Sequence, residues 1–256
     1  MGALFDSHCH LDFDDFASDR TAVMARAEAA GVAAIMIPGV SRRASSKTRI
    51  SSASIELFYG VGLHPYFIAE HDYADIDWLE QQLQRWPHAV VGEVGLDRSC
   101  SDYRKQQQLF TAQVELACAY QRPLIIHHRQ SQADLVAILT RYRSKLPAHA
   151  GVIHAFSGSY EQAQSWLALG FMIGVGGVIS YQRAAKTRST IARLPLESLV
   201  LETDAPAMPL AGYQGQRNEP AQLLLVVDAL AQLSGWSTAQ IAAQTSSNAY
   251  RLFANR

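Results

Sequence analysis

Short runs of apolar and often β-branched residues recur along the chain about every 20 to 35 residues, separated by more polar stretches. Runs of this length and spacing are typical of β-strands that alternate with helices. We therefore expect strands near Leu4–Ser7, Ala33–Ile37, Leu57–Val61, Ala89–Gly92, Leu124–Ile126, Gly151–Ile153, Phe171–Val175 and Leu199–Leu201.

The segments between these runs have features of helices. The Ala-rich stretch from Ser18 to Ala30 is followed by Gly31, a residue that often ends a helix. Ser101 and Asp102 are candidate caps for a longer helix that reaches Tyr120. Further helices are expected between Ser159 and Gly170 and from Glu219 to Leu233.

This alternation favours an α/β fold in which parallel strands close into a TIM-type (β/α)8 barrel. Such barrels commonly form a single domain of about 250 residues, and this chain has 256 residues, of which 48% are hydrophobic. No linker or low-complexity tract divides it, so we expect one barrel domain over residues 1–256. An open, doubly wound parallel sheet is the alternative.

Polar side chains gather where the expected strands end, which is where a TIM barrel carries its catalytic residues. A lone histidine beside an apolar run is more often a hydrogen-bonded structural residue than a metal ligand. Their joint placement favours a metal centre instead. The candidates are His8, His10, His64, Glu93, His127, His128, His154 and Asp204.

The pair His8 and His10 is the most informative part of this set. Residues i and i+2 of a strand point to the same side, with α-carbons about 6.6 Å apart, so both imidazoles could reach one ion. The candidate ligands outnumber the three that a catalytic zinc usually takes, and a carboxylate such as Glu93 can bridge two cations. We expect two divalent ions and hydrolysis by a metal-activated water.

Composition narrows the other possibilities. The 22 basic and 23 acidic residues give a formal charge of −1, so the bulk charge does not indicate a polyanionic partner. The three cysteines lack CxxC spacing, which argues against a disulfide framework or a thiolate zinc site. With no apolar run long enough for a bilayer and no signal-peptide pattern at the N-terminus, we expect a cytoplasmic protein without a membrane partner.

Several motifs together resemble the TatD family of metal-dependent deoxyribonucleases, which belongs to the amidohydrolase-like barrels. The resemblance is closest to a branch of uncharacterised bacterial metal-dependent hydrolases. It runs nearly from end to end of the chain. The motifs are DSHCHLD from Asp6, GLHPY from Gly62, GEVGLD from Gly92, PLIIHHR from Pro123, VIHAFSG from Val152, GVGG from Gly174, LETDAP from Leu201 and RNEP from Arg217.

The resemblance implies a role for each candidate. His8 and His10 would hold the first ion, and Glu93 would bridge both ions. The second ion would be completed by His127 and His154. Asp204 would be a ligand and also the base that orients or deprotonates the attacking water. His64 would lie near the substrate and hydrogen-bond a phosphate or the water.

Some positions depart from the family pattern or support weaker predictions. His128 stands where a small hydroxyl residue is common, and strand parity turns it away from His127. The short stretch from Asp97 to Gln106 puts the substrate preference in doubt. Arg129 and Arg217 could clamp a phosphate or support loops. For the basic cluster Arg183, Lys186 and Arg188, a solvated helix face is favoured over contact with nucleic acid.

Two smaller groups have alternative interpretations. The glycines of GVGG could let backbone amides approach a phosphate, although a tight turn is the simpler account. Asp6, Asp12 and Glu202 could orient the ligating imidazoles.

The leading functional hypothesis is a phosphoesterase that cleaves DNA, with a catalytic pair formed by Asp204 and Glu93. Its cofactors would be zinc, manganese, magnesium or nickel ions. An amidohydrolase or phosphoesterase acting on another, smaller phosphoester or amide is the alternative, because a fold and a metal pair do not fix the scissile bond. A non-catalytic metal-dependent binding protein is a third reading. The sequence indicates no obligate protein partner.

Overall fold

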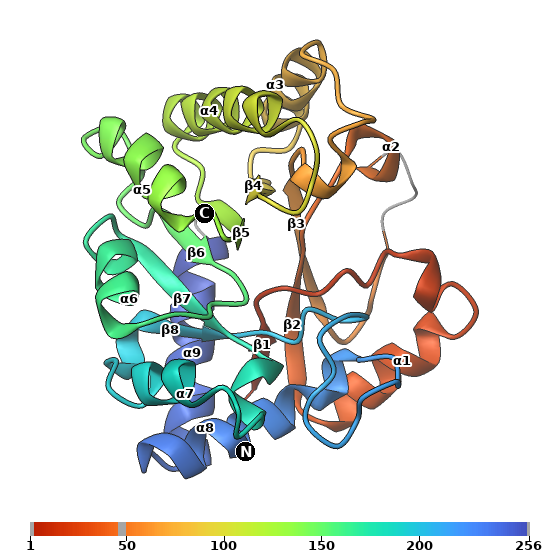
Figure 1. The fold of residues 1–256 in the computed structure, drawn as a ribbon. Coiled ribbons are helices and arrows are strands. Elements are labelled where there is room, and N and C mark those ends of the chain that lie inside the picture. The colour runs from red at the N-terminus through yellow and green to blue at the C-terminus, as the bar shows by residue number, and fades with distance from the viewer. Residues whose placement is uncertain (1–2, 46–49, 255–256) are drawn as a thin grey trace.

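Eight strands form a parallel sheet in which each strand pairs with the next one along the chain (Figure 1). The computed structural model describes residues 3–45 and 50–254. The strands are β1 (Leu4–Asp6), β2 (Val32–Ile37), β3 (Glu56–Val61), β4 (Val90–Asp97), β5 (Leu124–Arg129), β6 (Gly151–Ile153), β7 (Phe171–Val175) and β8 (Leu199–Leu201).

The sheet curls until its first and last strands meet. The Ser7 amide donates to the Leu201 carbonyl at 2.8 Å, and the Asp204 amide donates to the His8 carbonyl at 2.9 Å. A parallel bridge between Cys9 and Ala205 continues this contact beyond the strands. The prediction of a TIM-type barrel is therefore confirmed, and the open doubly wound sheet is excluded.

Helices surround the barrel (Figure 1). None among residues 3–45 and 50–254 is long and apolar enough to cross a bilayer. The α-helices are α1 (Arg20–Ala29), α2 (Arg42–Ser45), α3 (Asp75–Arg85), α4 (Tyr103–Tyr120), α5 (Gln132–Arg141), α6 (Tyr160–Leu167), α7 (Ala185–Ile191), α8 (Leu223–Ser234) and α9 (Thr238–Phe253). The 3-10 helices are η1 (Asp14–Phe16), η2 (Pro65–Phe67), η3 (Gly177–Ser180), η4 (Leu196–Ser198) and η5 (Pro220–Gln222).

Strands β4 and β5 extend further than the apolar pattern predicts. Their pairing continues from Gly95 opposite His127 to Asp97 opposite Arg129. A side chain at Gly95 would place its β-carbon 1.9 Å from the His127 carbonyl oxygen, so only glycine allows this approach. Pairing between backbones does not require apolar side chains, so the strands continue past the apolar runs. Glu93 and His127 therefore lie within paired strands.

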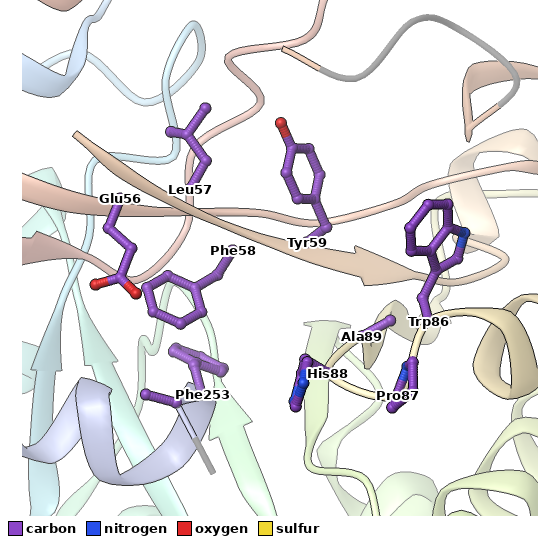
Figure 2. A pocket seen from close by; sticks show the side chains of 10 residues that line it. Glu56, Leu57, Phe58, Tyr59, Trp86, Pro87, His88, Ala89 and Phe253 are labelled. Carbon is purple, nitrogen blue, oxygen red and sulfur yellow. The ribbon is translucent and has the colours of Figure 1, made fainter. Parts of the chain in front are cut away.

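The amino ends of the strands are closed by aromatic residues. Phe5 stacks on Phe58 with ring centroids 5.1 Å apart and contacts the edge of Tyr250 at 5.0 Å. Beside them, β3 pairs with β2 from Glu56 onward, whereas its pairing with β4 begins only at Gly60. Where β3 and β4 are not yet paired, a cavity of about 530 Å³ opens at the end of the barrel opposite the candidate site. Phe58 faces Phe253 in this cavity (Figure 2).

Candidate metal centre

The buried carboxylate of Glu93 lies at the centre of the predicted site, and its two oxygens face different histidines. Oε2 lies 3.2 Å from His8 Nε2 and 3.4 Å from His10 Nε2. Oε1 lies 3.3 Å from His127 Nδ1 and 2.9 Å from His154 Nε2. The structure thus brings histidines from β5 and from the segments directly after β1 and β6 around one carboxylate on β4.

The first group of atoms has the dimensions of a metal site. His8 Nε2 and His10 Nε2 are 3.2 Å apart, and Asp204 Oδ1 lies 3.6 Å and 3.7 Å from them. A tetrahedron with metal-ligand bonds of 2.0–2.2 Å has edges of about 3.3–3.6 Å. Together with Glu93 Oε2, these atoms could hold one divalent ion.

The second group shares Glu93 with the first. His127 Nδ1 and His154 Nε2 are 3.4 Å apart and lie near Glu93 Oε1. The other ring nitrogen of His127 hydrogen-bonds Asp97 Oδ2 at 3.1 Å. With its proton on Nε2, His127 presents the lone pair of Nδ1 to the centre, as a metal ligand must.

His64 approaches the same carboxylate oxygen but with the opposite proton placement. Its Nε2 lies 3.1 Å from Glu93 Oε1, and its Nδ1 accepts a hydrogen bond from the Tyr66 amide at 3.0 Å. Burial lowers the pKa of His64 to about 4, so the ring is neutral near pH 7. A neutral ring that accepts at Nδ1 carries its proton on Nε2 and therefore faces the centre as a donor.

The charge balance of the cluster suits divalent cations. Burial lowers the pKa of His8 well below its ordinary value, which favours neutral imidazole. Burial opposes ionisation of Glu93, but the surrounding histidines outweigh it and hold the pKa of this carboxyl well below its usual range. Although burial opposes it, the carboxylates raise the pKa of His154 to about 10, and burial raises the pKa of Asp204, so without metal the cluster holds protons that metal binding would displace. With both carboxylates ionised and the imidazoles neutral, the cluster would carry two negative charges, which two dications would more than neutralise.

Asp97 is a site residue that the sequence analysis did not select. Its carboxylate holds His127 and also accepts hydrogen bonds from the Ser99 amide at 2.8 Å and the Ser99 hydroxyl at 2.6 Å. Burial alone would raise the pKa of Asp97, but these donors keep it below the ordinary value. The alternation of side chains along a strand could have identified Asp97, because Glu93, Gly95 and Asp97 share one face of the strand.

Asp6 supports the site through the backbone. Its Oδ1 accepts the Thr203 amide at 3.0 Å and its Oδ2 accepts the Thr203 hydroxyl at 2.6 Å, while the His8 amide lies 3.3 Å from Oδ1. Burial raises the pKa of Asp6 to about 7. Asp6 thus links the end of β1 to the turn after β8 by hydrogen bonds. These hydrogen bonds go to backbone amides and a hydroxyl, not to an imidazole ring.

Glu202 explains a glycine of the GVGG motif. Its Oε1 lies 3.8 Å from His154 Nδ1 and accepts a hydrogen bond from the Ala155 amide. A β-carbon at Gly174 would lie 2.5 Å from Glu202 Oε2. Burial raises the pKa of Glu202 to about 8. Gly174 therefore makes room for this buried carboxyl group, while the approach of GVGG backbone amides to a phosphate stays a prediction.

A cavity of about 480 Å³ opens over the centre, and the two predicted arginines lie differently relative to it. Arg129 is exposed and lines the cavity. Arg217 is outside its lining and forms a two-pronged ion pair with Asp19, at 2.9 Å and 2.7 Å. The Arg217 guanidinium also lies 4.7 Å from the ring centre of Phe16, so it joins two loops.

His128 borders this cavity without approaching Glu93. Its ring lies 6.5 Å from that of Trp166, and burial lowers its pKa to about 4. His127 is thus the residue of the pair whose ring nitrogen faces the carboxylate, as strand parity indicates.

Comparisons with known proteins agree with this geometry. A family model described as TatD related DNase matches residues 5–254. The chain belongs to the TatD family. The uncharacterized metal-dependent hydrolase YjjV of Escherichia coli K12 is 42% identical over 253 residues, which cover 97% of this chain and 96% of YjjV. The resemblance stated from the motifs is thereby confirmed.

Two further TatD relatives extend the comparison. A protein of Dickeya dadantii named 3'-5' ssDNA/RNA exonuclease TatD is 32% identical over 259 residues, covering 98% of this chain and 97% of the relative. The crystal structure of the E. coli YjjV protein superposes with a TM-score of 0.89 at 39% identity, covering 99% and 98% of the two chains. The prediction of a metal-dependent hydrolase is confirmed at the level of the family.

Proposed function

We propose that this TatD protein is a phosphodiesterase that uses two divalent ions to hydrolyse single-stranded nucleic acid. The observation that carries the proposal is the division of histidines between the two oxygens of Glu93. His8, His10 and Asp204 would hold one ion with Glu93, and His127 and His154 the other. When bound, such ions polarise a phosphoryl oxygen and lower the pKa of an attacking water.

Asp204 is the best placed base for that water. Its side chain is 15% exposed, whereas that of Glu93 is 3% exposed, so Asp204 is the carboxylate that solvent reaches more readily. A carboxylate at the wall of the cavity can orient a water and accept its proton during attack. The Nε2–H of His64 would meanwhile donate a hydrogen bond to a phosphoryl oxygen of the substrate. This is the substrate contact predicted for His64 from the sequence.

The relatives and the cavity rim support a nucleic-acid substrate. Relatives named 3'-5' ssDNA/RNA exonuclease are about as long as this chain, and they favour removal of nucleotides from a 3' end. Tyr66 lines the cavity and is 73% exposed. Exposed aromatic rings beside a reaction centre are suited to stacking on unpaired bases. Arg129 at the same rim would contact a phosphate.

The test is metal-dependent cleavage of end-labelled oligonucleotides. Wild-type protein, supplied separately with zinc, manganese, magnesium or nickel, should shorten single-stranded DNA from the 3' end. Asp204→Ala should lose this activity, and Asp77→Ala, an exposed change on α3, should retain it. Turnover of lactones or cyclic amides without cleavage of any phosphodiester would overturn the proposal and favour a small-molecule hydrolase. Metal-dependent DNA binding without turnover would favour a binding protein.

A further inference from the structure

A second polar cavity, of about 630 Å³, adjoins the candidate metal centre at the carboxyl ends of the strands. We call it the basic cavity. It lies between the loop after β5, the loop after β6 and the start of α7. His128 lines both this cavity and the one over the metal centre, so the two are neighbours. Its lining includes His128, Ser131, Gln132, Ala133, Arg183 and Lys186.

Two cations of the basic cluster identified in the sequence line this cavity. Arg183 and Lys186 are exposed, and neither forms an ion pair within the described part of the chain. The Arg183 guanidinium rests on the Tyr181 ring at 4.6 Å, which limits its motion without neutralising its charge. The third cation, Arg188, donates to the Ile179 carbonyl and is not in the lining.

The rest of the lining consists of polar and small residues and, within the described residues, includes no aspartate or glutamate. Ser131 precedes α5 without capping it, because its hydroxyl donates to the Leu96 carbonyl at 2.5 Å. The first amides of α5, at Gln132 and Ala133, thus have no side-chain cap and border the cavity. Amides at a helix start attract anions, and the one carboxylate in the first turn of α5, that of Asp134, is paired with Arg98.

We infer that the basic cavity binds the backbone phosphate of a nucleotide next to the one being cleaved, with Arg183 and Lys186 as its phosphate contacts. The inference rests on the proposed phosphodiesterase function. A volume of about 630 Å³ lies within the range of pockets that hold a small-molecule-sized group such as one nucleotide. Binding there makes the enzyme prefer chains, since a substrate with one phosphate cannot occupy both cavities.

The test compares a chain substrate with a one-phosphate substrate. The metal-loaded double variant Arg183→Ala, Lys186→Ala should show an apparent KM about tenfold higher for a single-stranded DNA oligonucleotide. Hydrolysis of bis(p-nitrophenyl) phosphate, which has one phosphate, should change less than about twofold. The matched control Arg143→Ala, Lys145→Ala removes one exposed arginine and one exposed lysine after α5 and should leave both activities unchanged.

Salt dependence supplies a second readout. Each phosphate contact on a single strand contributes about −0.7 to the slope of log affinity against log salt concentration. Oligonucleotide binding by the double variant, measured by fluorescence anisotropy, should have a slope about 0.7 less negative than that of wild type, because both cations contact the same phosphate.

The outcomes separate this inference from the proposed function. If wild type cleaves both substrates and the double variant matches it in KM and salt slope, the inference is overturned and the phosphodiesterase function stands. Equal losses on both substrates would also overturn it, because they indicate damage to the metal centre. If wild type cleaves no phosphodiester, the proposed function fails and the inference fails with it.

Discussion

Individual side chains in the centre are fixed by the atoms on their far side. His127 presents Nδ1 to Glu93 because Asp97 holds its Nε2, and His64 presents Nε2 because the Tyr66 amide occupies its Nδ1. The two histidines near this carboxylate oxygen therefore present different atoms to the centre: His127 an unprotonated nitrogen that could bind a metal, and His64 an N–H donor. This difference separates a candidate ligand from a candidate substrate contact.

Asp97→Asn should weaken metal binding about 10- to 100-fold, because loss of a carboxylate behind a ligating histidine typically has this effect. Affinity would be measured by competition with a chelator whose zinc affinity is known. The exposed change Asp77→Asn serves as the control and should bind zinc like wild type. Unchanged affinity in Asp97→Asn would contradict a positioning role for this carboxylate.

His64→Gln should retain the metal content of wild type while kcat/KM for oligonucleotides falls about 10- to 100-fold, as expected for one lost hydrogen bond to a charged phosphate. Metal content would be measured by elemental analysis of the purified protein. His88→Gln, at the opposite end of the barrel, is the matched control. Loss of one ion per chain in His64→Gln would show that this residue is a ligand instead.

Whole elements also depend on close contacts between neighbours. Strand β7 contains Gly174 where the Glu202 side chain from beyond β8 needs space, and Gly176 follows directly after the strand. The two glycines differ in how near that side chain comes. A β-carbon would lie 2.5 Å from a Glu202 carboxylate oxygen at Gly174, but 3.4 Å from the nearest Glu202 atoms at Gly176.

Gly174→Ala should lower the free energy of unfolding by about 1 to 3 kcal/mol, the usual effect of overpacking a buried site. Gly176→Ala should have a much smaller effect, because its new methyl group makes an ordinary contact. Urea unfolding of the two variants and wild type measures the difference. Equal stability of both variants would argue against steric conflict with Glu202.

The extent of sequence-based prediction differs between elements. The apolar runs located all eight strands, and the HxH spacing predicted that His8 and His10 face the same point, where both Nε2 atoms lie near Glu93 Oε2. The runs could not show that β4 and β5 continue through polar residues, because that extension depends on pairing between strands. Nor could they show the pairing of Arg217 with Asp19, 198 positions away, since only the closed barrel brings these residues together.

For the whole molecule, the metal centre and the barrel should stabilise each other. An ion that binds only the folded protein, at a hundredfold excess over its Kd, contributes about 2.7 kcal/mol of stability, which is lost when the ion is removed. For a chain of this length, that corresponds to roughly 5 to 10 °C in Tm.

Chelation should therefore lower the Tm of wild type by about this amount, and added zinc or manganese should restore it. Scanning calorimetry with and without chelator gives the measurement. Glu93→Gln removes the shared negative charge and should show a much smaller metal-dependent shift, while Glu70→Gln, at an exposed position, should behave as wild type. A wild-type Tm that is independent of metal would contradict this coupling.

The contact between β1 and β8 also has a consequence for when the protein becomes active. The Asp204 amide donates a hydrogen bond to the His8 carbonyl. These two residues are the first and the last of the centre along the chain, and they meet only when the barrel closes. A chain still being synthesised holds His8 and His10 early, yet it lacks Asp204 until four-fifths of its length has been made. We therefore expect hydrolysis only once Asp204 has been made and the barrel has closed, and recovery of activity during refolding should report the closing of this contact rather than the earlier growth of secondary structure.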